Sequence, residues 1–189
     1  MTRGIWSQEY WALKGDVKLF MWRKRIGDPS QDTSSKPLLF LVHGSSFCGP
    51  TGFDLQVPDR PDYSLMDKFA SYGFDVWTLD HEGYGRSDST KGNSPISEGV
   101  HDLKAGMELI IEETGQTDAA FYGSSSGALR AAAFAEAYPN HTNKLILDAF
   151  VWTGNGAPTL VERAKKMDQW TASNFRTVDR AFFLSIFTR

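Results

Sequence analysis

The sequence has a single cysteine, Cys48, among its 189 residues. One cysteine excludes an internal disulfide and a zinc site built on cysteine ligands. The sequence also lacks a long apolar run and a signal-peptide core behind its N-terminus, so neither a membrane span nor secretion is predicted. Its 20 basic residues are fewer than its 23 acidic residues, and the net charge of −3 predicts no basic surface for nucleic acid or anionic lipid. We therefore expect a cytoplasmic protein that binds neither nucleic acid nor a membrane.

The composition that remains is typical of a folded domain, with 41% hydrophobic and 23% charged residues. A hairpin is predicted over residues 6–24, and buried strands are predicted at 37–42, 74–79, 119–122 and 145–147. Helices are predicted at 64–72, 94–115 and 126–138, the second of them with Ser94 as its N-cap. Strands and helices that alternate in this way predict parallel strands with right-handed crossovers. The expected fold class is therefore α/β, with a doubly wound and mostly parallel sheet.

A G-x-S-x-G pattern at residues 123–127 lies between a predicted strand and a predicted helix. This placement is typical of a nucleophile elbow, a tight turn that presents a catalytic serine. Three serines are consecutive here, but only Ser125 has glycine both two positions before it and two positions after it. Ser125 is therefore the predicted nucleophile, and the alternative is a Gly/Ser-rich turn without chemistry.

Two further motifs follow buried strands: His-Gly-Ser-Ser at 43–46 and Asp-His-Glu-Gly-Tyr-Gly-Arg-Ser-Asp at 80–88. Together with the elbow, and in this order, they resemble the α/β-hydrolase superfamily in its serine-nucleophile, capped, esterase-like branch. The resemblance implies that the backbone amides of Ser45 and Ser126 form an oxyanion hole. It also implies that His43 supports this loop rather than acting as the base, and that the loop at 80–88 is structural. It implies no cofactor and no metal.

The resemblance also shows what the sequence does not contain. In this superfamily the nucleophile is followed along the chain by the acid and then by the histidine. No histidine follows His141, and none of the four histidines is assigned as the base. Asp148, after the last predicted strand, is the candidate acid, and a structural aspartate is the alternative. We expect the base, with the rest of the hydrolase domain, to come from a missing segment or a second chain.

Residues 1–150 are therefore predicted to form the N-terminal part of an α/β-hydrolase core that is incomplete at its C-terminus. From residue 151 the pattern changes to aromatic-rich helical stretches near 159–171 and 178–187. We expect these to begin a helical cap or lid, with ordinary helix packing as the alternative. The expected substrate-binding residues are Ser46, Phe47 and Trp152, in a pocket for a small hydrophobic substrate that contains a carbonyl group.

These features predict a serine hydrolase, in the first instance an esterase. Ser125 would attack an ester, amide, lactone or related carbonyl and form an acyl-enzyme. Carbon–carbon bond hydrolysis, cofactor-free perhydrolysis and acyl transfer would use the same residues and stay open. The alternative from another class is a ligand-binding protein or pseudoenzyme that keeps the hydrolase fold.

Overall fold

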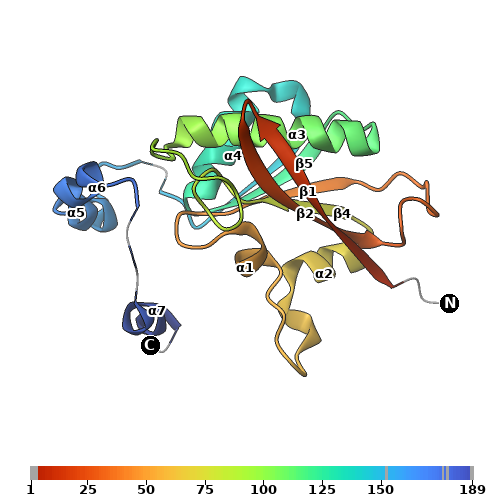
Figure 1. Cartoon of the computed structure of the whole chain (residues 1–189), viewed down its shortest axis with the longest axis horizontal. Helices are drawn as coiled ribbons and strands as arrows, with labels where there is room; N and C mark the ends of the chain where they lie inside the picture. Colours follow the sequence, from red (N-terminus) through yellow and green to blue (C-terminus); the bar gives the residue numbers. More distant parts are fainter. Residues whose placement is uncertain (1–3, 152, 176, 178, 188–189) are drawn as a thin grey trace. The chain divides into compact units, whose positions relative to one another are not determined.

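A computed structural model describes residues 4–151, 153–175, 177 and 179–187 (Figure 1). The chain divides into two compact units, Met1–Thr90 with Ser94–Phe150 and Lys91–Asn93 with Val151–Arg189. The second unit holds three short helices: α5 (Pro158–Ala164), α6 (Met167–Ala172) and α7 (Arg180–Phe187). That this second unit is a cap stays a prediction.

The first unit contains a six-stranded sheet with the strand order β1-β2-β4-β3-β5-β6. The strands are β1 (Ile5–Lys14), β2 (Val17–Ile26), β3 (Leu38–Val42), β4 (Asp75–Leu79), β5 (Ala119–Ser124) and β6 (Thr142–Asp148). The pairs β4–β3, β3–β5 and β5–β6 are parallel, whereas β1–β2 and β2–β4 are antiparallel. The mostly parallel sheet predicted from the sequence is therefore confirmed.

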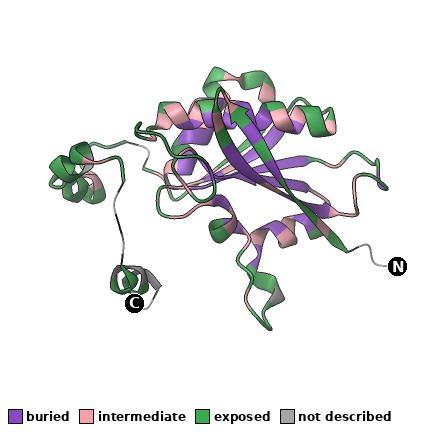
Figure 2. Cartoon of the chain, viewed as in Figure 1, coloured by how far each residue is buried: buried purple, intermediate pink, exposed green. Residues whose placement is uncertain are grey.

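Helices cover both faces of this sheet (Figure 1). The long helices α3 (Ile96–Thr114) and α4 (Ser126–Ala137) pack on one face, and the shorter α1 (Gly49–Phe53) and α2 (Leu65–Ser71) pack on the other. Figure 2 shows the buried residues of this unit along the strands and the inner sides of these helices. This arrangement is the predicted doubly wound fold.

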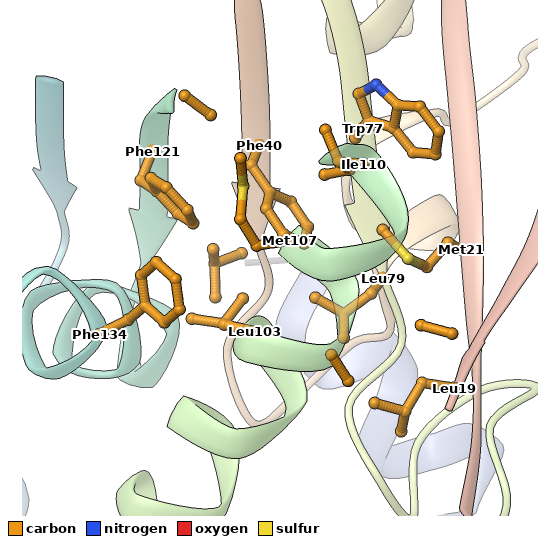
Figure 3. Packing of buried hydrophobic residues seen from close by; sticks show 14 of the residues in the cluster. Leu19, Met21, Phe40, Trp77, Leu79, Leu103, Met107, Ile110, Phe121 and Phe134 are labelled. Atoms are coloured by element: carbon orange, nitrogen blue, oxygen red, sulfur yellow. The ribbon is translucent and has the colours of Figure 1, made fainter. Parts of the chain in front are cut away.

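Strand β3 divides its side chains between the two layers. Phe40 and its alternate neighbours in the strand belong to the core under α3 and α4, whereas Leu39 and Leu41 belong to the core under α1 and α2. Phe40 packs against Phe121 at a ring distance of 5.4 Å, and Phe121 packs against Phe134 of α4 at 5.0 Å (Figure 3). Each large apolar side chain buried in this way stabilises the fold by about 1.5–3 kcal/mol.

A buried ion pair joins the N-terminal hairpin to the parallel strands. Arg23 of β2 donates two hydrogen bonds to Asp75 at the start of β4, at 2.9 and 2.6 Å. Its guanidinium also lies 4.7 Å from the centre of the Trp77 ring. Removal of one partner from such a buried pair typically costs about 3–5 kcal/mol. The pair therefore fixes the antiparallel strands against the parallel part of the sheet.

Two details differ from the prediction. Helix α3 has Pro95 as its N-cap without a side-chain cap bond, because the Ser94 hydroxyl and carbonyl both accept from the buried Arg130 guanidinium, at 3.0 and 2.8 Å. The helical stretch predicted near 159–171 is divided into α5 and α6, with non-helical geometry at Lys166. No helix within the described residues has the length and apolar character that a membrane span requires.

Candidate active site

Ser125 has an unusual backbone conformation, with φ 58° and ψ −124°. L-residues other than glycine rarely adopt positive φ angles, and such residues cluster where function requires a strained turn. Strand β5 ends one residue before Ser125, and α4 begins one residue after it. The Ser125 N–H donates to the carbonyl of Asp148 at 2.9 Å, which fixes the turn to the end of β6. The turn is a strand–turn–helix elbow, and the catalytic role of its serine stays a prediction.

The glycine at position 127 allows this turn to form. A Cβ added to Gly127 would lie 2.2 Å from the carbonyl oxygen of Val42 and 2.6 Å from that of His43. Both neighbours are backbone atoms, so a larger residue would push the first turn of α4 away from the end of β3. Close backbone packing therefore requires glycine at position 127.

Gly44 brings the loop after β3 into contact with Ser125. A Cβ on Gly44 would lie 3.0 Å from the Cβ of Ser125 and 3.4 Å from its Oγ. The peptide group between Gly44 and the exposed Ser45 therefore lies beside the predicted nucleophile. Ser126, at the first position of α4, follows the nucleophile on its other side. The two predicted oxyanion donors thus come from two elements that meet at Ser125.

His43 is buried, and both of its ring nitrogens have partners. Its Nε2 accepts a hydrogen bond from the His81 N–H at 3.0 Å, so the ring proton is on Nδ1, which donates to the Gly44 carbonyl at 2.7 Å. Burial, and then the neighbouring His81, lower the pKa of His43 well below its usual value. A neutral ring with both nitrogens in use supports the loop, as predicted, and is not a proton acceptor for Ser125.

The remaining histidines do not supply a base either. His81 is fully buried with its Nδ1 3.0 Å from Asp102, and His101 is exposed on α3. His141 lies 2.6 Å from the carbonyl of Thr117, before β5 begins, and so is at the opposite end of the sheet. Among the described residues, no histidine ring hydrogen-bonds to the Ser125 hydroxyl.

The candidate acid, Asp148, lies at the elbow. Its Oδ2 accepts hydrogen bonds from the Tyr122 hydroxyl at 2.9 Å and from the Ser124 hydroxyl at 3.3 Å. Burial and then the Asp148 carboxylate raise the pKa of Tyr122 to about 12. This geometry is compatible with a catalytic acid and with a structural anchor, so the role of Asp148 stays a prediction.

The loop at residues 80–88 is held by backbone hydrogen bonds. Asp80 is buried, and its carboxylate accepts from the N–H groups of Gly49 and Arg86 at 2.8 and 2.9 Å. Burial raises the pKa of Asp80 above its usual value. The Arg86 side chain makes a two-point ion pair with Glu9 of β1. These contacts give the loop a structural role, as predicted.

The predicted substrate-binding residues lie partly in the described structure. Ser46 is exposed and Phe47 is half-buried, between Ser45 and α1, whereas Trp152 lies outside the described residues. A groove of about 470 Å³ lies elsewhere, between the hairpin turn and α3, and contains none of these three residues. A substrate pocket at Phe47 stays a prediction.

One group of buried and half-buried residues could not be predicted from the sequence pattern. Lys14, His81 and Asp102 form a charged network behind the loop at 80–88. The available signal was Asp102, a charged residue beside Leu103 on the apolar face of a predicted helix.

Residues 62–181 match the model of a protein family described as serine aminopeptidase, S33. The chain belongs to this S33 family of α/β-hydrolases. The match includes the loop at 80–88, the elbow and Asp148.

Curated relatives of this S33 protein have hydrolase names. A 2-hydroxy-6-oxononadienedioate/2-hydroxy-6-oxononatrienedioate hydrolase of Paraburkholderia phymatum is 31% identical over 129 residues, which cover 67% of this chain and 39% of that protein. A hydrolase of the same name from Burkholderia vietnamiensis is 32% identical over 121 residues, 64% of this chain and 38% of that protein. The chain thus spans about two fifths of the length of these relatives.

Solved structures share the fold of the S33 protein. The 2-hydroxy-6-oxo-6-phenylhexa-2,4-dienoate hydrolase of a Rhodococcus species has a TM-score of 0.61 at 18% identity, over 87% of this chain and 54% of that chain. A CIB-like hydrolase from Thermoplasma acidophilum has a TM-score of 0.59 at 17% identity, over 87% and 83%. Similarity at this level of identity establishes the α/β-hydrolase architecture.

Proposed function

We propose that this S33 protein is a serine hydrolase in which Ser125 attacks a carbonyl carbon and forms an acyl-enzyme. The observation that best supports the proposal is the strained φ of 58° at Ser125, between the end of β5 and the start of α4. Strain of this kind is typical of functional positions, and the helix N-terminus favours negative charge on a developing oxyanion. The amides of Ser45 and Ser126 are the proposed oxyanion donors.

The proposed base is a histidine from outside this sequence, since the four histidines of the chain are occupied elsewhere or distant. Asp148 is the candidate acid, because its carboxylate lies at the elbow and its backbone carbonyl binds the Ser125 N–H. If Asp148 holds that histidine, Asp148→Asn should lower kcat by about 10⁴-fold. A loss smaller than about tenfold would assign Asp148 to anchoring the turn.

The proposed substrate contains an ester, amide, lactone or ketone carbonyl. The compounds in the names of the curated relatives have hydroxy, oxo and carboxylate groups but no ester or amide. Hydrolysis of a carbon–carbon bond is therefore a candidate reaction beside ester hydrolysis. The S33 protein should therefore be tested with short-chain p-nitrophenyl esters and with a 2-hydroxy-6-oxodienedioate. Turnover of only one class would define the substrate.

A fluorophosphonate probe followed by peptide mapping tests the nucleophile. We expect one adduct, on Ser125, which disappears in Ser125→Ala together with about 10³-fold or more of the hydrolysis. The control is Ser97→Ala, an exposed serine on α3, which should label like the wild type. An adduct on Ser124 or Ser126, or no adduct on the intact protein, would contradict the proposal. Substrate binding without an adduct would support the ligand-binding alternative.

A further inference from the structure

A partly buried cluster of charged residues lies behind the loop at 80–88. The ammonium group of Lys14, at the end of β1, lies 2.5 Å from Glu82, 2.6 Å from Asp102 and 3.3 Å from Glu98. Burial alone would lower the pKa of Lys14, but its hydrogen bonds to Asp102 and Glu82 outweigh burial and raise it. Lys14 is therefore a fixed positive charge against the fully buried carboxylate of Asp102.

The second oxygen of the same carboxylate binds the loop. Asp102 Oδ2 accepts from the Nδ1 of His81 at 3.0 Å and from the N–H of Glu82 at 3.1 Å. Burial, and then the charges of Arg130 and Lys14, hold the pKa of His81 well below its usual value. His81 is therefore neutral, and the charge of Asp102 is balanced by Lys14 rather than by the imidazole.

The backbone of His81 continues the connection to the elbow. Its N–H donates to His43 Nε2 at 3.0 Å, and His43 Nδ1 donates to the Gly44 carbonyl at 2.7 Å. Because a peptide group is planar and trans, the direction of the Gly44 carbonyl also fixes the direction of the Ser45 N–H. A continuous series of polar contacts thus runs from Lys14 on the hairpin to the Ser45 amide.

We propose that Lys14, Asp102 and His81 are positioning residues that aim the Ser45 amide at the oxyanion through the ring of His43. The inference rests on the proposed function, because it takes the Ser45 N–H as an oxyanion donor. The competing interpretation is that the cluster only joins the hairpin, α3 and the loop. A structural joint would affect stability, whereas a positioning series must also affect the Ser45 amide and kcat.

The test compares Asp102→Asn and Lys14→Met with a control, Lys104→Met, which removes an exposed ion pair with Glu108 on the same helix. Loss of one oxyanion donor lowers kcat by about 10²–10³-fold, so misalignment should lower it by about tenfold. We expect that loss in both variants, with KM unchanged within about twofold, because the donor acts on the transition state. Lys14→Arg, which keeps the charge, should restore most of kcat.

Nuclear magnetic resonance gives a measurement that is independent of turnover. In Asp102→Asn and Lys14→Met the Ser45 amide cross-peak should move, whereas that of Lys104→Met should stay at the wild-type position. In the wild type, the ring ¹⁵N shifts of His43 should show a neutral imidazole with its proton on Nδ1.

The two measurements separate failure of this inference from failure of the proposed function. An unmoved Ser45 amide in folded variants would overturn the inference, even if kcat fell. A His43 ring with its proton on Nε2 would overturn it in the wild type, so the test does not depend on folding of the variants. If the wild type hydrolyses nothing but the shifts behave as expected, the proposed function fails and so does the oxyanion role of the Ser45 amide, whereas the contacts that orient this amide stand.

Discussion

Ser125 lies between two groups of residues that differ in burial: His43 after β3, and the pair Tyr122 and Asp148 at the ends of β5 and β6. His43 is 2% exposed and has a hydrogen bond on each ring nitrogen. Asp148, by contrast, is exposed, and two hydroxyl groups hold its carboxylate. The ring of His43 is thus held by buried contacts within this unit.

Gly127→Ala should have the largest effect on stability, because it separates α4 from the end of β3 on the buried side of Ser125. The new methyl group would lie 2.2 Å from the Val42 carbonyl oxygen, and neither backbone can move without loss of buried contacts. We expect destabilisation at the extreme of single substitutions, above about 4 kcal/mol, measured by urea denaturation.

The matched control is Gly52→Ala in α1, whose added Cβ would have its nearest contact at 3.9 Å. Its stability should change by less than about 1 kcal/mol, since alanine also favours the helix. Equal losses in the two variants would show that the close packing at Gly127 is not what holds the elbow.

Acidification should lower the stability of the protein, because two histidines on the buried side of Ser125 are neutral in the folded state. The pKa values of His43 and His81 are lowered in the folded protein, so below about pH 6.5 the unfolded chain binds protons that the folded chain does not. The free energy of unfolding should therefore fall as pH drops from 7 to 5. The slope contributed by each histidine is at most about 1.4 kcal/mol per pH unit.

Urea denaturation across this range measures that slope. His43→Gln should remove about half of the histidine contribution to this slope. A slope that is the same in wild type and His43→Gln would contradict the neutral, buried state of the ring.

The last prediction concerns the pKa of Tyr122, beside the exposed Asp148. Asp148→Asn removes the negative charge beside the Tyr122 hydroxyl, so the pKa of Tyr122 should fall from about 12 toward its ordinary value near 10. Ultraviolet absorbance of tyrosinate between pH 9 and 13 measures this change, with Tyr122→Phe to identify the signal. An unchanged titration would show that burial alone raises this pKa.

Much of the fold follows from the sequence pattern. Residues 38–42 are apolar at every position, as expected of a strand covered on both faces, and Gly115 ends α3 in a left-handed conformation. Ser94 was predicted as a cap from local chemistry, but the buried Arg130 takes its hydroxyl and carbonyl as acceptors instead. Local preference could not anticipate a guanidinium from another helix.

The geometry around Ser125 could be predicted where it depends on neighbouring residues in the sequence and was missed where it depends on distant ones. The elbow is five consecutive residues, and its turn is present at Ser125. Lys14 and Asp102 are 88 positions apart, and nothing in the spacing of either indicates the other. Such pairs are visible only once α3 is placed against the hairpin strands of the sheet.

The backbone angle of Ser125 has a consequence for the evolution of this chain. A strained residue of this kind costs about 1–3 kcal/mol, an appreciable fraction of the stability of a small domain. The positive φ angle of Ser125 therefore lowers the tolerance of the protein to other destabilising substitutions. Well-packed aromatic side chains such as Phe121 and Phe134 contribute stability that offsets the cost of this strained turn.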